Sequence, residues 1–98
     1  MPTVTSTGFA KHDISLSANT ETIVNLAKDC RSAEVIVWDS TEPVYVTVNG
    51  TAATVAGDST YALLIGANAA SFPVPGEIGL TSVRLISAAS ATVSVTGS

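Results

Sequence analysis

The chain has 98 residues, the length of one small domain, and a formal net charge of −4. Only 12% of the residues are charged, and the four basic residues are scattered, so neither nucleic-acid binding nor membrane binding is expected. Hydrophobic residues make up 46% but aromatic residues only 5%, which predicts a core built from aliphatic side chains.

The first ten residues alternate serine and threonine with the apolar Val4 and Phe9, and Gly8 interrupts the pattern. We interpret residues 1–10 as an extended N-terminal arm and residues 11–98 as the folded domain. The N-terminus carries neither the positive region nor the apolar stretch of a secretory signal, so we expect synthesis in a cytoplasm.

The next two stretches predict strands joined by a turn at Asn19. Residues 12–17 alternate, so that Ile14 and Leu16 share one face and polar residues the other. Residues 21–27 form a second apolar stretch with β-branched residues, which is typical of a strand.

Residues 34–39 predict a third strand, with valines on one face and Ile36 and Trp38 on the other. A strand that is apolar on both faces is typical of the centre of a sheet. Trp38 is the sole tryptophan, and we expect it to pack under the arm or at a subunit contact.

Residues 44–48 give the clearest strand, with valines alternating with Tyr45 and a threonine. The dipeptide Asn49-Gly50 predicts a tight reversal, because both residues tolerate positive φ. Gly57-Asp58 predicts a second turn, and residues 61–65 predict the strand that returns beside the first.

Three further strands are expected at residues 69–74, 81–87 and 92–96, and Pro75-Gly76 marks a loop between the first two. The chain thus predicts about eight short antiparallel strands and no helix. This all-β pattern is typical of a β-sandwich or a small barrel, and eight strands of this length favour a single small β-sandwich of jelly-roll or immunoglobulin-like type.

The polar residues do not form a recognisable catalytic or metal-binding pattern. His12 is the single histidine, and in a regular strand it points away from its neighbour Asp13. Cys30 is the single cysteine, and we interpret it as a buried packing residue. Asp39 and Glu42 fall in a predicted turn, where carboxylates bond local backbone. We expect no enzymatic activity, no cofactor, no metal and no small-molecule substrate.

Carbohydrate binding would need exposed aromatic side chains, and Trp38, Tyr45 and Tyr61 are available. Trp38 and Tyr45 would share a face only if their two strands paired in the right register. We favour core or interface packing for these side chains.

One segment resembles a pattern found in small structural proteins of tailed bacteriophages. It is the strand Val-Tyr-Val-Thr-Val-Asn-Gly at residues 44–50, followed by Ala-Thr-Val-Ala-Gly-Asp-Ser-Thr-Tyr at residues 53–61. The later stretch Val-Arg-Leu-Ile-Ser at residues 83–87, followed by residues 93–95, is similar to the end of that pattern. A weaker similarity exists to modules appended to chitin-degrading enzymes, with Ala53 near the place of their proline.

The bacteriophage resemblance implies a head decoration protein that adds to the outside of an assembled capsid and stabilises it. The implied partners are the major capsid protein and copies of the chain itself, for example in a homotrimer, and the implied location is the virion surface. Candidate subunit or capsid contacts are Val4, Phe9, Trp38 and Tyr45. A tail or connector component and a carbohydrate-binding or adhesion module remain as alternatives.

Overall fold

The computed structural model describes residues 3–27, 30–48, 52–57, 61–63, 68–73 and 81–97. These residues form nine strands. No helix long and apolar enough to cross a membrane occurs among them. The strands are β1 (Thr3–Thr5), β2 (Ala10–Leu16), β3 (Thr22–Asn25), β4 (Ser32–Ser40), β5 (Val44–Val48), β6 (Tyr61–Leu63), β7 (Asn68–Pro73), β8 (Ser82–Ser87) and β9 (Ala91–Gly97).

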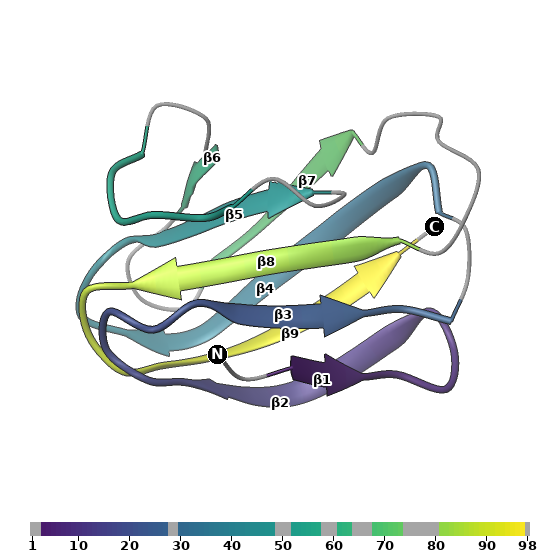
Figure 1. Cartoon of the computed structure of the whole chain (residues 1–98), viewed down its shortest axis with the longest axis horizontal. Coiled ribbons are helices and arrows are strands. Elements are labelled where there is room, and N and C mark those ends of the chain that lie inside the picture. The colour runs from purple at the N-terminus through teal and green to yellow at the C-terminus, as the bar shows by residue number, and fades with distance from the viewer. Residues whose placement is uncertain are drawn as a thin grey trace.

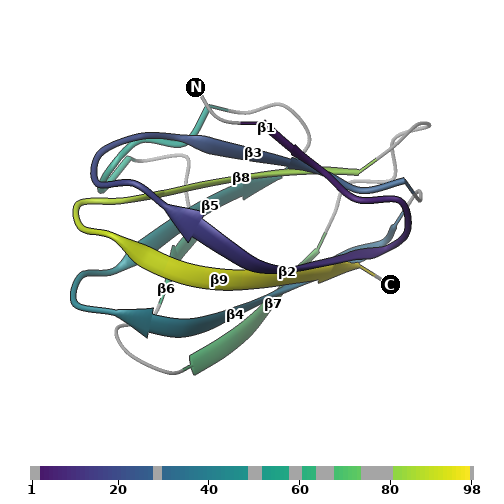
Figure 2. The same ribbon diagram turned by 90° about the horizontal axis from the view of Figure 1, so that it is seen from below.

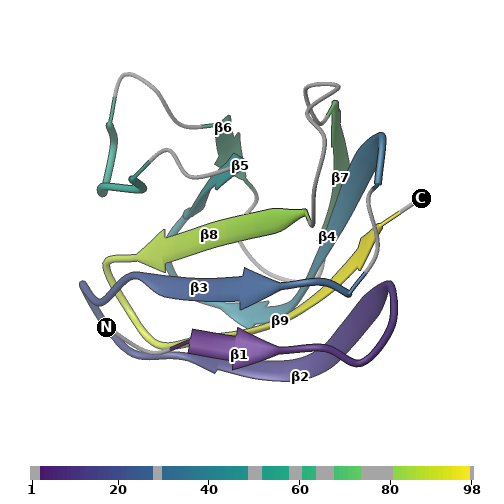
Figure 3. The ribbon, with the colours of Figure 1, turned by 45° about the vertical axis from the view of Figure 1, so that its right-hand side comes forward.

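The described strands form two sheets that pack face to face (Figure 1, Figure 2). One sheet has five strands in the order β1-β3-β8-β5-β6, and the other has four in the order β2-β9-β4-β7. The chain crosses from the first sheet to the second between β1 and β2 (Figure 3). The predicted all-β, two-sheet architecture is confirmed.

The core between the sheets is aliphatic, as predicted. Inward positions recur every second residue because side chains of a strand alternate between its two faces. β-Branched residues fill most of these positions and pack well on a pleated surface. The buried inward side chains include Ile14, Leu16, Val24, Leu26, Val35, Val37, Val44, Val46, Val83, Leu85, Val93 and Val95.

Several local predictions are also confirmed. β4 lies between β9 and β7, so the strand with two apolar faces is interior to its sheet. β5 pairs antiparallel with β6, as expected for the strand and its return. Asn19 adopts φ 56° in the turn after β2. The predicted turn at Asn49-Gly50 lies outside the described residues, as does Asp58. Within the described residues, a turn spans Thr54–Gly57 and is closed by a 3.0 Å bond from Gly57 N to Thr54 O.

The N-terminal residues lie against the domain in the isolated chain. β1 pairs parallel with β3, and Ser6 N donates to Asn25 O at 2.8 Å. Val4 is partly buried and packs against the core. These residues add a strand that the sequence pattern does not single out, and their role as an arm that reaches a neighbour stays a prediction.

Gly97 at the end of β9 lies in close contact with the core. A Cβ atom built there would lie 2.3 Å from Cys30 Sγ and 3.0 Å from Leu26 Cδ1, whereas one built at Gly8 would meet nothing within 4 Å. Cys30 is buried, in agreement with its prediction as a packing residue.

We therefore expect Gly97→Ala to lower the free energy of unfolding by about 1–3 kcal/mol, because the added methyl group overpacks the core. Gly8→Ala is the matched control and should change it by less than about 0.5 kcal/mol. Urea unfolding followed by circular dichroism measures both. Equal effects of the two substitutions would contradict the packing at Gly97.

Two buried threonines differ in whether their hydroxyl group has a partner. Thr22 is 1% exposed and lies opposite Leu85, and its Oγ1 has no hydrogen-bond partner. Thr81 is 2% exposed, and its Oγ1 accepts a 2.8 Å bond from Cys30 N. An unpaired buried hydroxyl is destabilising, whereas a paired one is not.

Thr22→Val should therefore raise the free energy of unfolding by about 1–2 kcal/mol, since valine has the same shape and needs no hydrogen bond. Thr81→Val should lower it by about 1–3 kcal/mol, because it leaves a buried amide without an acceptor. Thermal unfolding of the pair of variants tests the opposite signs, and a destabilised Thr22→Val protein would refute this assignment.

Candidate functional site

Part of the outer face of the five-stranded sheet is covered by the chain itself. Thr47 and Ile86 flank inward valine and leucine positions and so face outward, yet they are only 1% and 8% exposed. Ala53, in the segment that follows β5, is 4% exposed. Burial on both sides of this sheet indicates that residues 52–57 lie over its outer surface.

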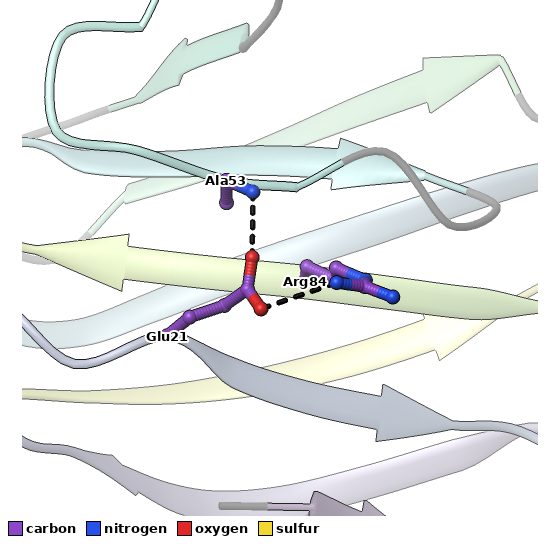
Figure 4. Close-up of polar contacts among 3 residues, drawn as sticks. All are labelled: Glu21, Ala53 and Arg84. Carbon is purple, nitrogen blue, oxygen red and sulfur yellow. Dashed lines mark hydrogen bonds and ion pairs between the residues drawn. The ribbon is translucent and has the colours of Figure 1, made fainter. Parts of the chain in front are cut away.

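One carboxylate holds this covering segment in place (Figure 4). Glu21 lies just before β3, and its Oε2 accepts a 2.6 Å bond from Ala53 N. Its Oε1 accepts a bond from Arg84 Nη1 on β8 at 3.2 Å. The side chains of Arg84 and Glu21 are 23% and 11% exposed, so the contact is largely shielded from water and is screened less by salt than an exposed ion pair.

Removing the Glu21 carboxylate should release the covering segment. Glu21→Ala leaves both Arg84 and the Ala53 amide without their partner, and we expect a loss of about 1–3 kcal/mol in unfolding free energy. Glu34→Ala, at an exposed position of β4, is the control, with an expected change below about 0.5 kcal/mol. Amide hydrogen exchange gives a local readout, since Ala53 N should lose protection in Glu21→Ala alone. Unchanged protection of the Ala53 amide in Glu21→Ala would contradict the role of Glu21 in holding the covering segment.

The outer face of the four-stranded sheet, in contrast, carries an exposed aromatic side chain. Among the described residues, the large hydrophobic side chains that are exposed are Phe9, Trp38 and Val55, at 55%, 54% and 38%. Trp38 belongs to β4, and Phe9 immediately precedes β2.

Two register irregularities flank the same part of β9. On β2, Lys11 pairs with Val95 and Ile14 with Val93, so two β2 residues oppose one β9 residue, Ser94. On β4, Val37 pairs with Val93 while Asp39 pairs with Thr92, so Trp38 is the extra residue. Bulges of this kind bend a strand and re-aim side chains, and they are common beside functional sites.

Ser94 connects the two irregularities. It is fully buried, and its Oγ accepts a 2.7 Å bond from Trp38 Nε1. The same oxygen accepts a weaker 3.4 Å bond from the backbone N of Asp13, which has φ 55°. A positive φ is tolerated by aspartate better than by most residues. The hydroxyl of Ser94 thus fixes the indole ring while leaving over half of Trp38 exposed.

A shallow polar pocket lies beside this arrangement. It has a volume of about 310 Å³ and is formed where β2 ends, β9 begins and β4 ends. Hydroxyl-bearing side chains and one carboxylate dominate its wall. The lining residues are Ser15, Leu16, Ser17, Asp39, Ser90, Ala91 and Thr92.

The structure separates the four predicted contact residues. Phe9 and Trp38 are exposed, Val4 packs on the core, and Tyr45 is half-buried. Tyr45 belongs to the five-stranded sheet, so the pairing that would place it on one face with Trp38 does not occur: β4 and β5 lie in different sheets. The side chain of Tyr61 lies outside the described residues.

Two expectations about polar residues also need correction. His12 and Asp13 are both exposed, because the bulge in β2 breaks the regular alternation. Asp39 belongs to β4, as the strand predicted over residues 34–39 implies, and not to the adjoining turn, because β4 continues to Ser40. Among the residues that the structure describes, no three His, Cys, Asp or Glu side chains gather closely enough to hold a metal ion.

Sequence reasoning missed Ser94 and the pocket residues. A serine between two valines is what simple alternation produces, so nothing in the sequence distinguishes Ser94 from a solvated position. The bulges that give it a role arise from pairing between strands far apart in the chain.

Comparisons with known proteins add no assignment: no protein-family model matches the chain, and no curated protein and no solved structure gives a significant match.

Proposed function

We propose that the chain is a structural virion protein of a tailed bacteriophage, a capsid decoration protein that binds the outside of the head and stabilises it. The observation that carries the proposal is the strand order. The order β2-β9-β4-β7 facing β3-β8-β5-β6, with β1 added at one edge, supports assigning the sandwich to the jelly-roll type. Jelly rolls recur in viral coat proteins, and this support is an analogy at the level of the fold.

The surface chemistry is compatible with repeated contacts between proteins. Charged residues are 12% of the chain, about half of the usual share, so docking displaces little strongly bound water around charges. Each contact that buries apolar surface contributes roughly 25 cal/mol per Å², and many copies on one shell act together.

Phe9 is the contact residue best placed to bind a capsid. It is 55% exposed, and the chain around it is held firmly, since Gly97 N donates to Phe9 O at 2.7 Å and Ala27 N donates to Gly8 O at 2.8 Å. An apolar side chain on an ordered backbone loses little freedom when it docks. Thr3, Thr5 and Thr7, which precede Phe9 in the chain, are also exposed and extend the proposed contact.

The proposal is tested by co-sedimentation of the purified protein with expanded empty capsids of the virus that encodes it, together with mass-resolved solution size. We expect binding that saturates at a fixed ratio to the capsid protein. Phe9→Ala should weaken it about tenfold to a hundredfold, because an aromatic side chain buries a large apolar area.

Val55→Ala is the matched control, since Val55 is also an exposed apolar side chain but belongs to the segment over the five-stranded sheet. It should bind capsids like the unchanged protein. A folded protein that does not bind capsids would overturn the proposal. Ring-shaped assemblies without affinity for capsids would instead indicate a tail or connector component.

A further inference from the structure

We propose that Trp38 and the adjoining pocket at the outer end of the four-stranded sheet bind a neutral saccharide. This inference is independent of the virion proposal. The site combines an exposed aromatic ring with a pocket of hydroxyl groups and one carboxylate. A pyranose ring presents the complementary surfaces, because its faces carry C–H groups and its rim carries hydroxyl groups. The C–H groups pack against the electron-rich face of an indole ring.

Trp38 is positioned before any ligand arrives. Its Nε1 donates to the buried Ser94 Oγ at 2.7 Å, while 54% of the residue stays exposed. A side chain fixed in this way loses little conformational entropy on binding. The hydrogen bond to Ser94 holds the exposed ring in one orientation and leaves over half of the side chain available to a ligand.

The pocket wall selects against the other common classes of small ligand. Ser15, Ser17, Ser90 and Thr92 offer hydroxyl groups, and Asp39 offers a carboxylate. None of the lining residues, all within the described part of the chain, carries a positive charge that would hold a phosphate or carboxylate. One carboxylate is too few to chelate a metal ion. A polyol suits the wall, because adjacent hydroxyl groups can donate to the two oxygens of one carboxylate.

The ring and the pocket are close enough to act on one ligand. Trp38 directly precedes Asp39 of the pocket wall, and its partner Ser94 stands two residues from Thr92 on the same face of β9. Residues two apart on a strand are separated by roughly 7 Å. The pocket volume of about 310 Å³ lies at the lower end of the range for small-ligand sites. A short oligosaccharide can therefore place one ring against the indole and the next in the pocket.

The bulge in β4 is what brings the two functional groups together. In a regular strand, neighbours point to opposite faces, so either Trp38 or Asp39 would point into the core. Here Val37 pairs with Val93 and Asp39 with Thr92, and both Trp38 and Asp39 are exposed. An aromatic ring and a carboxylate at adjacent positions on one face therefore depend on this local geometry.

The test uses the fluorescence of Trp38, which is the sole tryptophan and so reports on this site alone. The full chain is titrated with hexasaccharides of glucose, mannose and N-acetylglucosamine in their common linkages. We expect at least one to give a saturable change in emission, with a dissociation constant on the order of 0.1–1 mM. Asp39→Asn should weaken this binding about tenfold or more, because hydrogen bonds to a charged group are lost.

Glu34→Gln is the matched control, since Glu34 is an exposed carboxylate near the start of β4 and is not part of the pocket wall. It should bind like the unchanged protein. Trp38→Phe, followed by backbone NMR shifts, should also weaken binding. No saturable change with any hexasaccharide up to about 10 mM would overturn the inference. Binding that is insensitive to both Asp39→Asn and Trp38→Phe would overturn it as well.

Capsid co-sedimentation separates this inference from the virion proposal. Asp39→Asn should bind capsids normally, because the pocket lies at the opposite end of β9 from Phe9. Loss of capsid binding in Asp39→Asn would show that this surface is a protein contact and would overturn the saccharide assignment.

Discussion

The structure depends on a two-residue alternation of valine in the strands that face each other across the core. Val35 and Val37 on β4 and Val93 and Val95 on β9 are fully buried, and β5 and β8 supply the opposing layer. A shift of one residue in any of these pairings would turn the buried set toward solvent. Burial of the valines therefore sets the register, and the register decides which polar residues share each outer face.

The two bulges modify this alternation on the outer face without disturbing the core. Each neighbour of β9 contains one extra residue, but the inward-facing residues beside it remain paired. Ile14 of β2 pairs with Val93, and Val37 of β4 pairs with Val93 from the other side. Ser94 lies between them, and its hydroxyl accepts both the indole N–H of Trp38 and the amide of Asp13. Core packing and surface chemistry are thus specified by different residues of the same strand.

The sequence predicts the strands and the aliphatic core because both depend on spacing along the chain. Alternation identifies the strands around Val35 and Val46, and the turn at Asn19 follows from its tolerance of positive φ. The association of Trp38 with Ser94 is not predictable in this way, since 56 residues separate them. Glu21 and Ala53 meet for the same kind of reason, through a loop that returns over the sheet. Sites that depend on pairing between distant strands need the fold.

The outer faces of the two sheets differ in how far the rest of the chain covers them. The two proposed binding sites also lie apart on the surface. The segment held by Glu21 covers part of the outer face of the five-stranded sheet, whereas the outer face of the four-stranded sheet is exposed around Trp38. Phe9 is bonded to Gly97 at one end of β9, and the pocket includes Ala91 at the other end. Seven residues of strand span roughly 20 Å. The proposed capsid contact at Phe9 and the proposed saccharide pocket therefore lie apart on the surface, and neither proposal excludes the other.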